Sequence, residues 1–286
     1  MKIGAVASCF APATDPDNLV KLAQAMDHAG LDSLLFGEHV LLFNEMEFGY
    51  PGSPDGKLPI PAGHGSPDQA AVIGYLASQT KTLRFGTSIS LIPQRNPVYT
   101  AKEFATLDWL SKGRIELGVG VGWCKEEVES CGYGWADRGQ RCNEALELMC
   151  KLWTEEEVTF EGQHFNVSSA RMDPKPVNRT PLPLLIGGYS EAALHRTAKY
   201  GQGWLGFGLT PTAAEGMLQR IEAALSAAGR TLDDLEIVIM PGDDSLEAAR
   251  DFAAMGVNRL VPLVDTQSDF SARMDYLRQL KSTFDT

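Results

Sequence analysis

Residues 83–121 read LRFGTSISLIPQRNPVYTAKEFATLDWLSKGRIELGVGV, and this stretch decides the fold. The apolar runs at its two ends, Leu83–Ile89 and Arg114–Val121, are typical of buried strands. Between them, Asn96-Pro97 supplies a helix cap followed by proline at the first helical turn, which predicts a helix over Val98–Leu110. A strand, a helix and a second strand in this order indicate two parallel strands joined by a crossover helix.

The same alternation extends in both directions and covers the chain. The sequence predicts eight strands, at Lys2–Ala7, Asp32–Phe36, Leu83–Ile89, Arg114–Val121, Pro183–Ile186, Gly203–Phe207, Leu235–Met240 and Arg259–Val264. Each is followed by a predicted helix: Pro16–Ala29, Pro67–Gln79, Val98–Leu110, Asp137–Trp153, Ser190–Tyr200, Thr212–Ala228, Leu246–Ala254 and Ser268–Leu280. Eight such units predict an α/β fold, the (β/α)₈ TIM barrel. A doubly wound open sheet is the alternative, because periodicity alone does not show closure.

Two insertions interrupt the alternation. Gly37–Ser66 is a long segment rich in glycine and proline after the second strand, and loops of this length in a compact domain are usually functional. Val158–Phe160 and His164–Val167, on either side of Glu161-Gly162, predict a small hairpin after the fourth helix. Because no linker or low-complexity tract separates the units, we expect residues 1–286 to form a single domain.

Charge and cysteine content exclude several classes of protein. Lys and Arg number 25 against 37 Asp and Glu, so the net charge of −12 argues against a partner that is a nucleic acid or an anionic membrane surface. Five cysteines at irregular spacing predict reduced thiols and a cytoplasmic location. No stretch approaches the roughly 18 apolar residues of a membrane span.

In a barrel of this kind the active site lies at the carboxyl ends of the strands. There, Gly187-Gly188-Tyr189-Ser190 follows a strand and opens a helix. Free amides at a helix start favour an anion such as phosphate, and glycines let it approach the backbone. The alternative interpretation is a tight turn in which Ser190 is the helix cap.

Gly118–Gly122, with sequence GVGVG, ends the fourth strand. Its third glycine comes one position too early for a dinucleotide-binding motif. Two interpretations remain: a close-packed barrel corner, which the frequency of structural glycines favours, or a flat backbone wall for a planar ring.

Glu38-His39 follows the second strand and opens the long insertion. His39 at that place can donate a proton or hydrogen-bond a ligand. The sequence has no His-x-His pair and no carboxylate cluster at matching strand ends, so we expect no metal site; a metal-dependent hydrolase using His39 and His64 is the weaker alternative. It also lacks the G-x-S-x-G motif of α/β-hydrolases and the P-loop motif.

Taken together, the segments resemble the luciferase-like, flavin-dependent oxidoreductases, and most of all the branch that uses the deazaflavin coenzyme F420. The resemblance runs to about Trp204 and rests on an ordered set of matches: Ser33–Val40, Gly86–Ile89, Pro93–Pro97, Leu107-Asp108, Ser111–Arg114, Gly118–Trp123, Ala136–Gly139, Lys175-Pro176 and Ile186–Gly188.

The resemblance implies site residues around a flavin-type ring. A non-proline cis peptide at Ser88–Ile89 would lie against the ring. Gly120 and Val121 would line the cofactor, and the turn that contains Gly187, Gly188, Tyr189 and Ser190 would hold its phosphate. His39 matches an active-site histidine. Some deazaflavin dehydrogenases carry a glutamate directly after the fourth-strand glycines, but here that place is Trp123, with Glu126 and Glu127 further on.

The leading hypothesis is therefore an enzyme that transfers hydride between F420 and a small organic substrate, within a protein that positions the ring and excludes water. One alternative is an FMN-dependent luciferase-like monooxygenase that uses molecular oxygen. Another is a non-catalytic flavin-binding protein on the same scaffold, since fold does not fix function. Many members of the family are dimers, so the resemblance also implies a homodimer.

Overall fold

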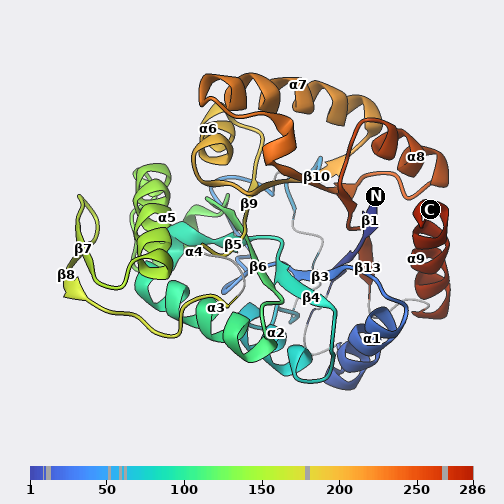
Figure 1. The fold of residues 1–286 in the computed structure, drawn as a ribbon, viewed down its shortest axis with the longest axis horizontal. Coiled ribbons are helices and arrows are strands. Elements are labelled where there is room, and N and C mark those ends of the chain that lie inside the picture. Colours follow the sequence, from blue (N-terminus) through green and yellow to red (C-terminus); the bar gives the residue numbers. More distant parts are fainter. Residues whose placement is uncertain are drawn as a thin grey trace.

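The computed structural model describes residues 1–8, 10, 14–50, 53–57, 60, 63–177, 181–265 and 270–285. Cys9, one of the five cysteines, and Ser268, the first residue of the last predicted helix, lie outside these ranges. Helices surround a central set of parallel strands, as Figure 1 shows. Among the described residues, none of the helices combines the length and apolar character that crossing a membrane requires.

The strands close into a barrel. They are β1 (Lys2–Ile3), β2 (Ala5–Ser8), β3 (Ser33–Phe36), β4 (Arg84–Thr87), β5 (Ser90–Leu91), β6 (Ile115–Gly120), β9 (Leu184–Gly187), β10 (Gly203–Leu209), β11 (Glu236–Pro241), β12 (Arg259–Leu260) and β13 (Leu263–Asp265). The first strand, interrupted at Gly4, pairs with the last strand through Lys2–Arg259 and Val6–Leu263, and with β3 on its other side. The predicted (β/α)₈ barrel is therefore confirmed, and the open sheet is excluded.

The helices follow the strands in the predicted order. They are α1 (Pro16–His28), α2 (Gln69–Ala77), α3 (Pro97–Ser111), α4 (Lys125–Ser130), α5 (Arg138–Thr154), α6 (Glu191–Tyr200), α7 (Pro211–Ala227), α8 (Leu246–Ala254) and α9 (Phe270–Phe284). Side chains of Asp15, Asn96, Ser190, Thr210 and Ser245 accept amide hydrogens at the starts of five of them. These caps satisfy amide donors that a helix start leaves unpaired. Because a cap and the amides that it accepts lie within a few residues of each other, the helix starts could be predicted from the local sequence.

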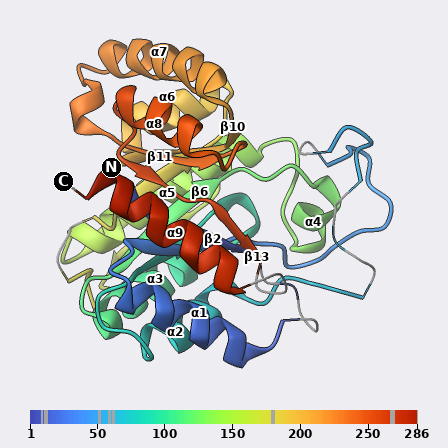
Figure 2. The ribbon, with the colours of Figure 1, turned by 90° about the vertical axis from the view of Figure 1, so that its right-hand side faces the viewer.

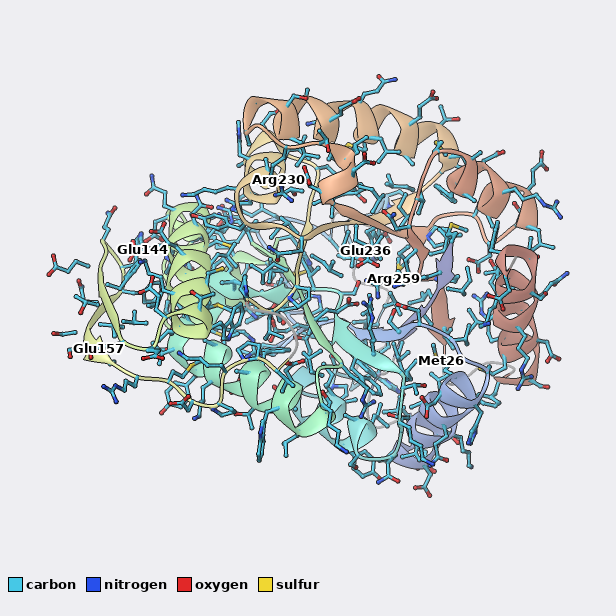
Figure 3. The ribbon with its side chains drawn as sticks, in the orientation of Figure 1. Met26, Glu144, Glu157, Arg230, Glu236 and Arg259 are labelled. Atoms are coloured by element: carbon cyan, nitrogen blue, oxygen red, sulfur yellow. The ribbon has the colours of Figure 1, made fainter. Side chains whose placement is uncertain are left out.

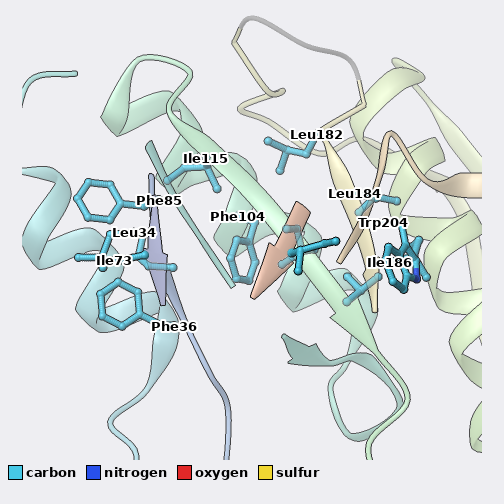
Figure 4. Packing of buried hydrophobic residues seen from close by; sticks show 14 of the residues in the cluster. Leu34, Phe36, Ile73, Phe85, Phe104, Ile115, Leu182, Leu184, Ile186 and Trp204 are labelled. Carbon is cyan, nitrogen blue, oxygen red and sulfur yellow. The ribbon is translucent and has the colours of Figure 1, made fainter. Parts of the chain in front are cut away.

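The main hydrophobic core lies between the strands and the helices. Alternate strand residues such as Leu34, Phe36 and Phe85 face outward and pack against Ile73 of α2 and Phe104 of α3 (Figure 4). A second, smaller cluster fills the barrel interior with Val6, Leu35, Leu185, Leu205, Val238, Met240 and Val261. Because successive residues of a strand point to opposite faces, β2, β3, β9, β10 and β11 each contribute residues to both clusters.

A layer of charged side chains fills the barrel at the amino ends of the strands. Arg259 is fully buried and lies 2.7 Å from Glu116 and 3.0 Å from Asp32. It also lies 3.3 Å from Glu236, and Figure 3 labels these two residues beside one another. Arg84 adds ion pairs of 2.9 Å to Glu116 and 3.1 Å to Asp32. Burial alone would lower the pKa of Arg259, but the neighbouring carboxylates raise it above its ordinary value. Mutually neutralised charges therefore fill the barrel interior at this end.

Both predicted insertions are present. Residues 37–68 separate β3 from α2. The hairpin consists of β7 (Val158–Glu161) and β8 (Asn166–Ala170) and follows α5; Glu144 of α5 accepts the amides of Gln163, His164 and Phe165.

The prediction differed from the structure at one helix and in the continuity of three strands, of which the first is interrupted at Gly4 and the last at Val261-Pro262. The short helix α4 was missed, because six residues give too little periodicity. The third strand is also not continuous, since it breaks into β4 and β5 at Ser88–Ile89.

Candidate active site

Ile89 forms the floor of the barrel mouth. It packs on the interior cluster and remains partly exposed above it. The peptide bond that joins it to Ser88 is cis, as the resemblance implied. The carbonyl of Ile89 accepts a hydrogen bond of 3.4 Å from Gln69, whose Nε2 also donates to Phe36 at 2.7 Å. The floor is thus apolar and tied to the ends of two neighbouring strands.

Glycines surround this floor because larger residues would collide with it. A Cβ atom on Gly120 would lie 2.0 Å from Cδ1 of Ile89, and one on Gly118 would lie 1.9 Å from the carbonyl oxygen of Thr87. A Cβ atom on Gly187 would lie 3.2 Å from Cγ2 of Ile89. The close-packing interpretation of the GVGVG segment is therefore confirmed at Gly118 and Gly120.

Val121 packs against the outer core rather than into the barrel. The cofactor-lining roles of Gly120 and Val121 stay predictions.

The twin-glycine turn connects β9 to α6. Gly188 has φ +116°, a conformation that favours glycine, and a Cβ atom there would lie 3.0 Å from Cβ of Ala193. Ser190 caps the helix by accepting the amide of Ala193 at 3.2 Å. The cap interpretation is thus correct, yet it uses only one donor. The other first-turn amides of α6 have no partner within the helix, so anion binding at this turn remains open.

Tyr189 and Trp204 fix the shape of this turn. The hydroxyl of Tyr189 donates to the carbonyl of Phe207 and accepts its amide at 2.6 Å. Nε1 of Trp204 donates to the carbonyl of Gly188 at 3.1 Å. These bonds fasten the turn to the end of β10 and leave the Phe207 side chain 49% exposed beside it. Phe207 was not among the predicted site residues, although it ends a predicted strand and so lies where the active site was expected.

His39 lies across the mouth and is bound to Glu127 of α4. Its Nδ1 lies 3.0 Å from Oε2 of Glu127, whose side chain is fully buried. Oε1 of Glu127 accepts the amide of Val40 at 2.6 Å and Nε2 of Gln94 at 3.2 Å. No sequence spacing connects His39 to Glu127, so this contact could not be predicted.

The neighbouring Glu38 has a structural role. It accepts the Leu91 amide at 2.5 Å and Nε of Arg95 at 2.7 Å. Burial raises the pKa of Glu38, and the charge of Arg95 only partly offsets that effect. Because its two oxygens are engaged with β5 and Arg95, Glu38 holds the second and third strand ends together.

An aromatic group borders His39. Trp123 meets the ring of His39 edge-on at 5.6 Å and that of Tyr50 at 5.2 Å. Phe48 stacks on Trp135, and Lys125 pairs with Glu47. These contacts hold the insertion after β3 beside α4 at the barrel mouth, where Figure 2 shows the two segments side by side.

The structure thus brings the predicted residues to one end of the barrel but does not show what they bind. Ile89 forms the floor, His39 stands on one side, and the Gly187–Ser190 turn stands at the end of β9. Within the described ranges, no three His, Cys, Asp or Glu side chains gather as metal ligands would.

This fold and this mouth define a (β/α)₈ barrel with its candidate site at the carboxyl ends of the strands. Residues 1–279 match the family model described as luciferase-like monooxygenase, and the chain belongs to that family.

Among its relatives, an uncharacterized protein of Mycobacterium tuberculosis is 29% identical over 86% of this chain and 82% of its own. An F420-dependent glucose-6-phosphate dehydrogenase of Amycolatopsis mediterranei is 30% identical over 84% of this chain and 68% of its own.

Solved structures share the fold. An F420-dependent secondary alcohol dehydrogenase in complex with an F420-acetone adduct superimposes with a TM-score of 0.78 at 19% identity, over 98% of this chain and 97% of its own. The monooxygenase RslO1 from Streptomyces bottropensis gives 0.76 at 18% identity, over 99% and 98%. The similar proteins include both F420-dependent dehydrogenases and monooxygenases, and a redox enzyme of the flavin or deazaflavin type is supported.

Proposed function

We propose that the protein is an F420-dependent oxidoreductase that transfers hydride to or from a small, uncharged alcohol or carbonyl compound. The observation that carries this proposal is that an apolar floor, a twin-glycine turn and a histidine share one barrel mouth. Relatives that are 30% identical and named F420-dependent support the choice of cofactor.

The residues at the mouth fit such a cofactor. Gly188 leaves the turn without a side chain at the helix start, where an anion is favoured by the unpaired amides and the helix dipole. These amides would hold the phosphate, and Ser88 and Ile89 would lie against the ring. When bound, a deazaflavin supplies two-electron hydride chemistry. The protein positions the ring, orients the substrate and excludes water.

His39 would handle the substrate proton. Its side chain is 18% exposed, so it is reachable from the mouth while remaining fixed by Glu127. The flanking Trp123 and Tyr50 would offer an aromatic wall to the organic part of the substrate.

The charges around the mouth argue against a phosphorylated substrate. In α4 and in the segments between each barrel strand and the helix after it, the basic residues are Lys57, Arg95 and Lys125, and acidic residues outnumber them several-fold. Arg95 pairs with Glu38 and Glu103, and Lys125 pairs with Glu47. Arg95 and Lys125 are therefore already neutralised by carboxylates and are not free to bind a substrate phosphate. An uncharged substrate therefore suits this mouth better than a sugar phosphate.

An FMN-dependent monooxygenase is the second candidate. It is favoured by the similarity to RslO1 along nearly the whole of both chains. The two candidates differ chemically, because reduced FMN reacts readily with oxygen and reduced F420 does not.

Titration of the purified protein with F420 and with FMN, followed by ring fluorescence, tests the proposal. We expect saturable binding of F420 and weaker binding of FMN. Reduction of bound F420 is then measured with uncharged secondary alcohols and with glucose 6-phosphate. Turnover of at least one alcohol and none of the phosphate is expected. Tighter binding of FMN would favour the monooxygenase, binding of either ring without turnover would favour a non-catalytic flavin-binding protein, and binding of neither ring would reject the proposal.

A further inference from the structure

The contact between Glu127 and His39 bears on the protonation of the histidine ring as well as on its position. Oε1 of Glu127 accepts hydrogen bonds from Val40 and Gln94, both of which can only donate there. Oε2 faces Nδ1 of His39 at 3.0 Å. One proton lies between these two atoms. Imidazole is a stronger base than a carboxylate, so the proton belongs to the ring.

We infer that Glu127 is a positioning residue that holds neutral His39 in the tautomer protonated at Nδ1. The bare nitrogen is then Nε2, which makes no hydrogen bond to a described residue. This goes beyond the proposed function, which rests on His39 but does not state which of its nitrogens is free.

The tautomer determines which atom of His39 exchanges a proton with the substrate, and this step rests on the proposed function. A substrate hydroxyl at the mouth donates to Nε2. When the alcohol is oxidised to a carbonyl, its hydroxyl proton would pass to Nε2 of His39, and bound F420 in its oxidised form would supply the acceptor for the hydride that leaves the carbon atom. The imidazolium that forms is stabilised by the buried carboxylate of Glu127 at Nδ1, as in other histidine–carboxylate pairs. In the reverse direction the same nitrogen returns the proton.

The tautomer is measured directly, without cofactor or substrate. The protein is labelled with ¹⁵N-histidine, and two-bond ¹H–¹⁵N correlations are recorded about two units above the reference histidine pKa of about 6.5. The chain has five histidines, and His39→Asn identifies the signal of interest by its loss. We expect the pattern of the Nδ1-protonated tautomer. The opposite pattern in the unmodified protein would overturn the inference without requiring any variant at Glu127.

Glu127→Gln provides the second test. The oxygen of the introduced amide has to face the donors Val40 and Gln94, so its NH₂ group faces Nδ1 of His39. His39 then has to accept there, and its tautomer inverts. Glu126→Gln is the matched control, because Glu126 accepts the Glu47 amide and has no contact with His39. An unchanged tautomer in a folded Glu127→Gln variant would contradict the inference.

A kinetic measurement connects the tautomer to turnover. Glu127→Gln should lower kcat by about 10²–10⁴-fold, the range of general acid–base contributions, with the Kd for F420 changed by no more than about twofold. If F420 does not bind at all, the proposed function fails while the tautomer result stands. If F420 turns over normally in the variant, the role of Glu127 fails while the proposed function stands.

Discussion

The δ1 methyl group of Ile89 lies 2.0 Å from the point that a Cβ atom on residue 120 would occupy. Gly120 is therefore required by the side chain that forms the floor of the mouth. The same side chain limits residue 187, where a Cβ atom would lie 3.2 Å from Cγ2 of Ile89. The shape of the site depends on one isoleucine and the two glycines that make room for it.

Adding a methyl group beside this floor should destabilise the barrel. Gly120→Ala forces Ile89 to rotate and should lower the free energy of unfolding by about 1–3 kcal/mol, as overpacking does. Gly118→Ala should cost more, because it meets the backbone carbonyl of Thr87, which cannot rotate away. Gly216→Ala in α7 has no neighbour within 4 Å and should be neutral or stabilising by up to about 1 kcal/mol. Urea denaturation measures all three, and equal stability of Gly120→Ala and the wild type would contradict the packing argument.

The twin-glycine turn should contribute to cofactor affinity. Gly188→Val places a side chain at the start of α6 and should weaken F420 binding at least about tenfold, or about 1.4 kcal/mol. Gly208→Val is the control, since Gly208 also has positive φ, +64°, but no neighbour within 4 Å. In both variants a valine has to adopt positive φ, which lowers the free energy of unfolding. Fluorescence titration should show reduced affinity only for Gly188→Val, and a similar Kd for both variants would remove the phosphate site from this turn.

Loss of the imidazole should affect turnover rather than cofactor binding. His39→Ala removes the only group that we propose as proton acceptor and should lower kcat about 10²–10⁴-fold. The Kd for F420 should stay close to that of the wild type, because the role that we propose for His39 is toward the substrate and not toward the cofactor. Stopped-flow reduction of F420 measures the first quantity and titration the second. Wild-type turnover in His39→Ala would eliminate its proposed role.

The charged layer at the other end of the barrel should be intolerant of single changes. Arg259→Met leaves Asp32, Glu116 and Glu236 with only Arg84 and Lys2 nearby, and breaking a buried pair in this way costs about 3–5 kcal/mol. The double variant Arg259→Met with Glu116→Gln removes one charge of each sign and should regain part of that loss. Denaturation midpoints test this, and additive losses would show that the two residues are not coupled.

Asp27 should make the free energy of unfolding depend on pH in the acidic range. Burial acts to raise the pKa of Asp27, but the Thr82 hydroxyl and the amides of Lys81, Thr82 and Leu83 outweigh it and lower the pKa to about 2. A lowered pKa stabilises the folded state above the unfolded value of about 3.8, and the benefit disappears as the pH falls from about 4 to 2.

Asp27→Asn should therefore be less stable than the wild type by about 1–2 kcal/mol at neutral pH, a figure reduced for the partial exposure of Asp27, with the difference vanishing near pH 2. Asp251→Asn, at an exposed position of α8, should show no such difference. A gap between wild type and Asp27→Asn that persists unchanged near pH 2 would contradict the assignment.

Local signals in the sequence predicted most of the elements. Asn96-Pro97 and Ser190 marked helix starts because a cap acts on amides two or three residues away. The cis peptide at Ser88–Ile89 was expected only through the resemblance, and the break in the third strand and the helix α4 were missed. His39 was placed at the mouth because it directly follows β3, and its partner Glu127 was not, because the two are 88 residues apart.

The sequence by itself determined the eight strand–helix units, the two insertions, the turn at Gly187–Ser190 and the family resemblance. Each of these depends on side-chain period, capping or motif order within a short stretch of chain. Only the tertiary structure decided that Lys2 pairs with Arg259 to close the barrel and that Glu127 holds His39. It also decided that Ile89 occupies the space that a side chain at residue 120 would need. These contacts depend on strand register and tilt, which join residues far apart in the chain and leave no periodic trace in it.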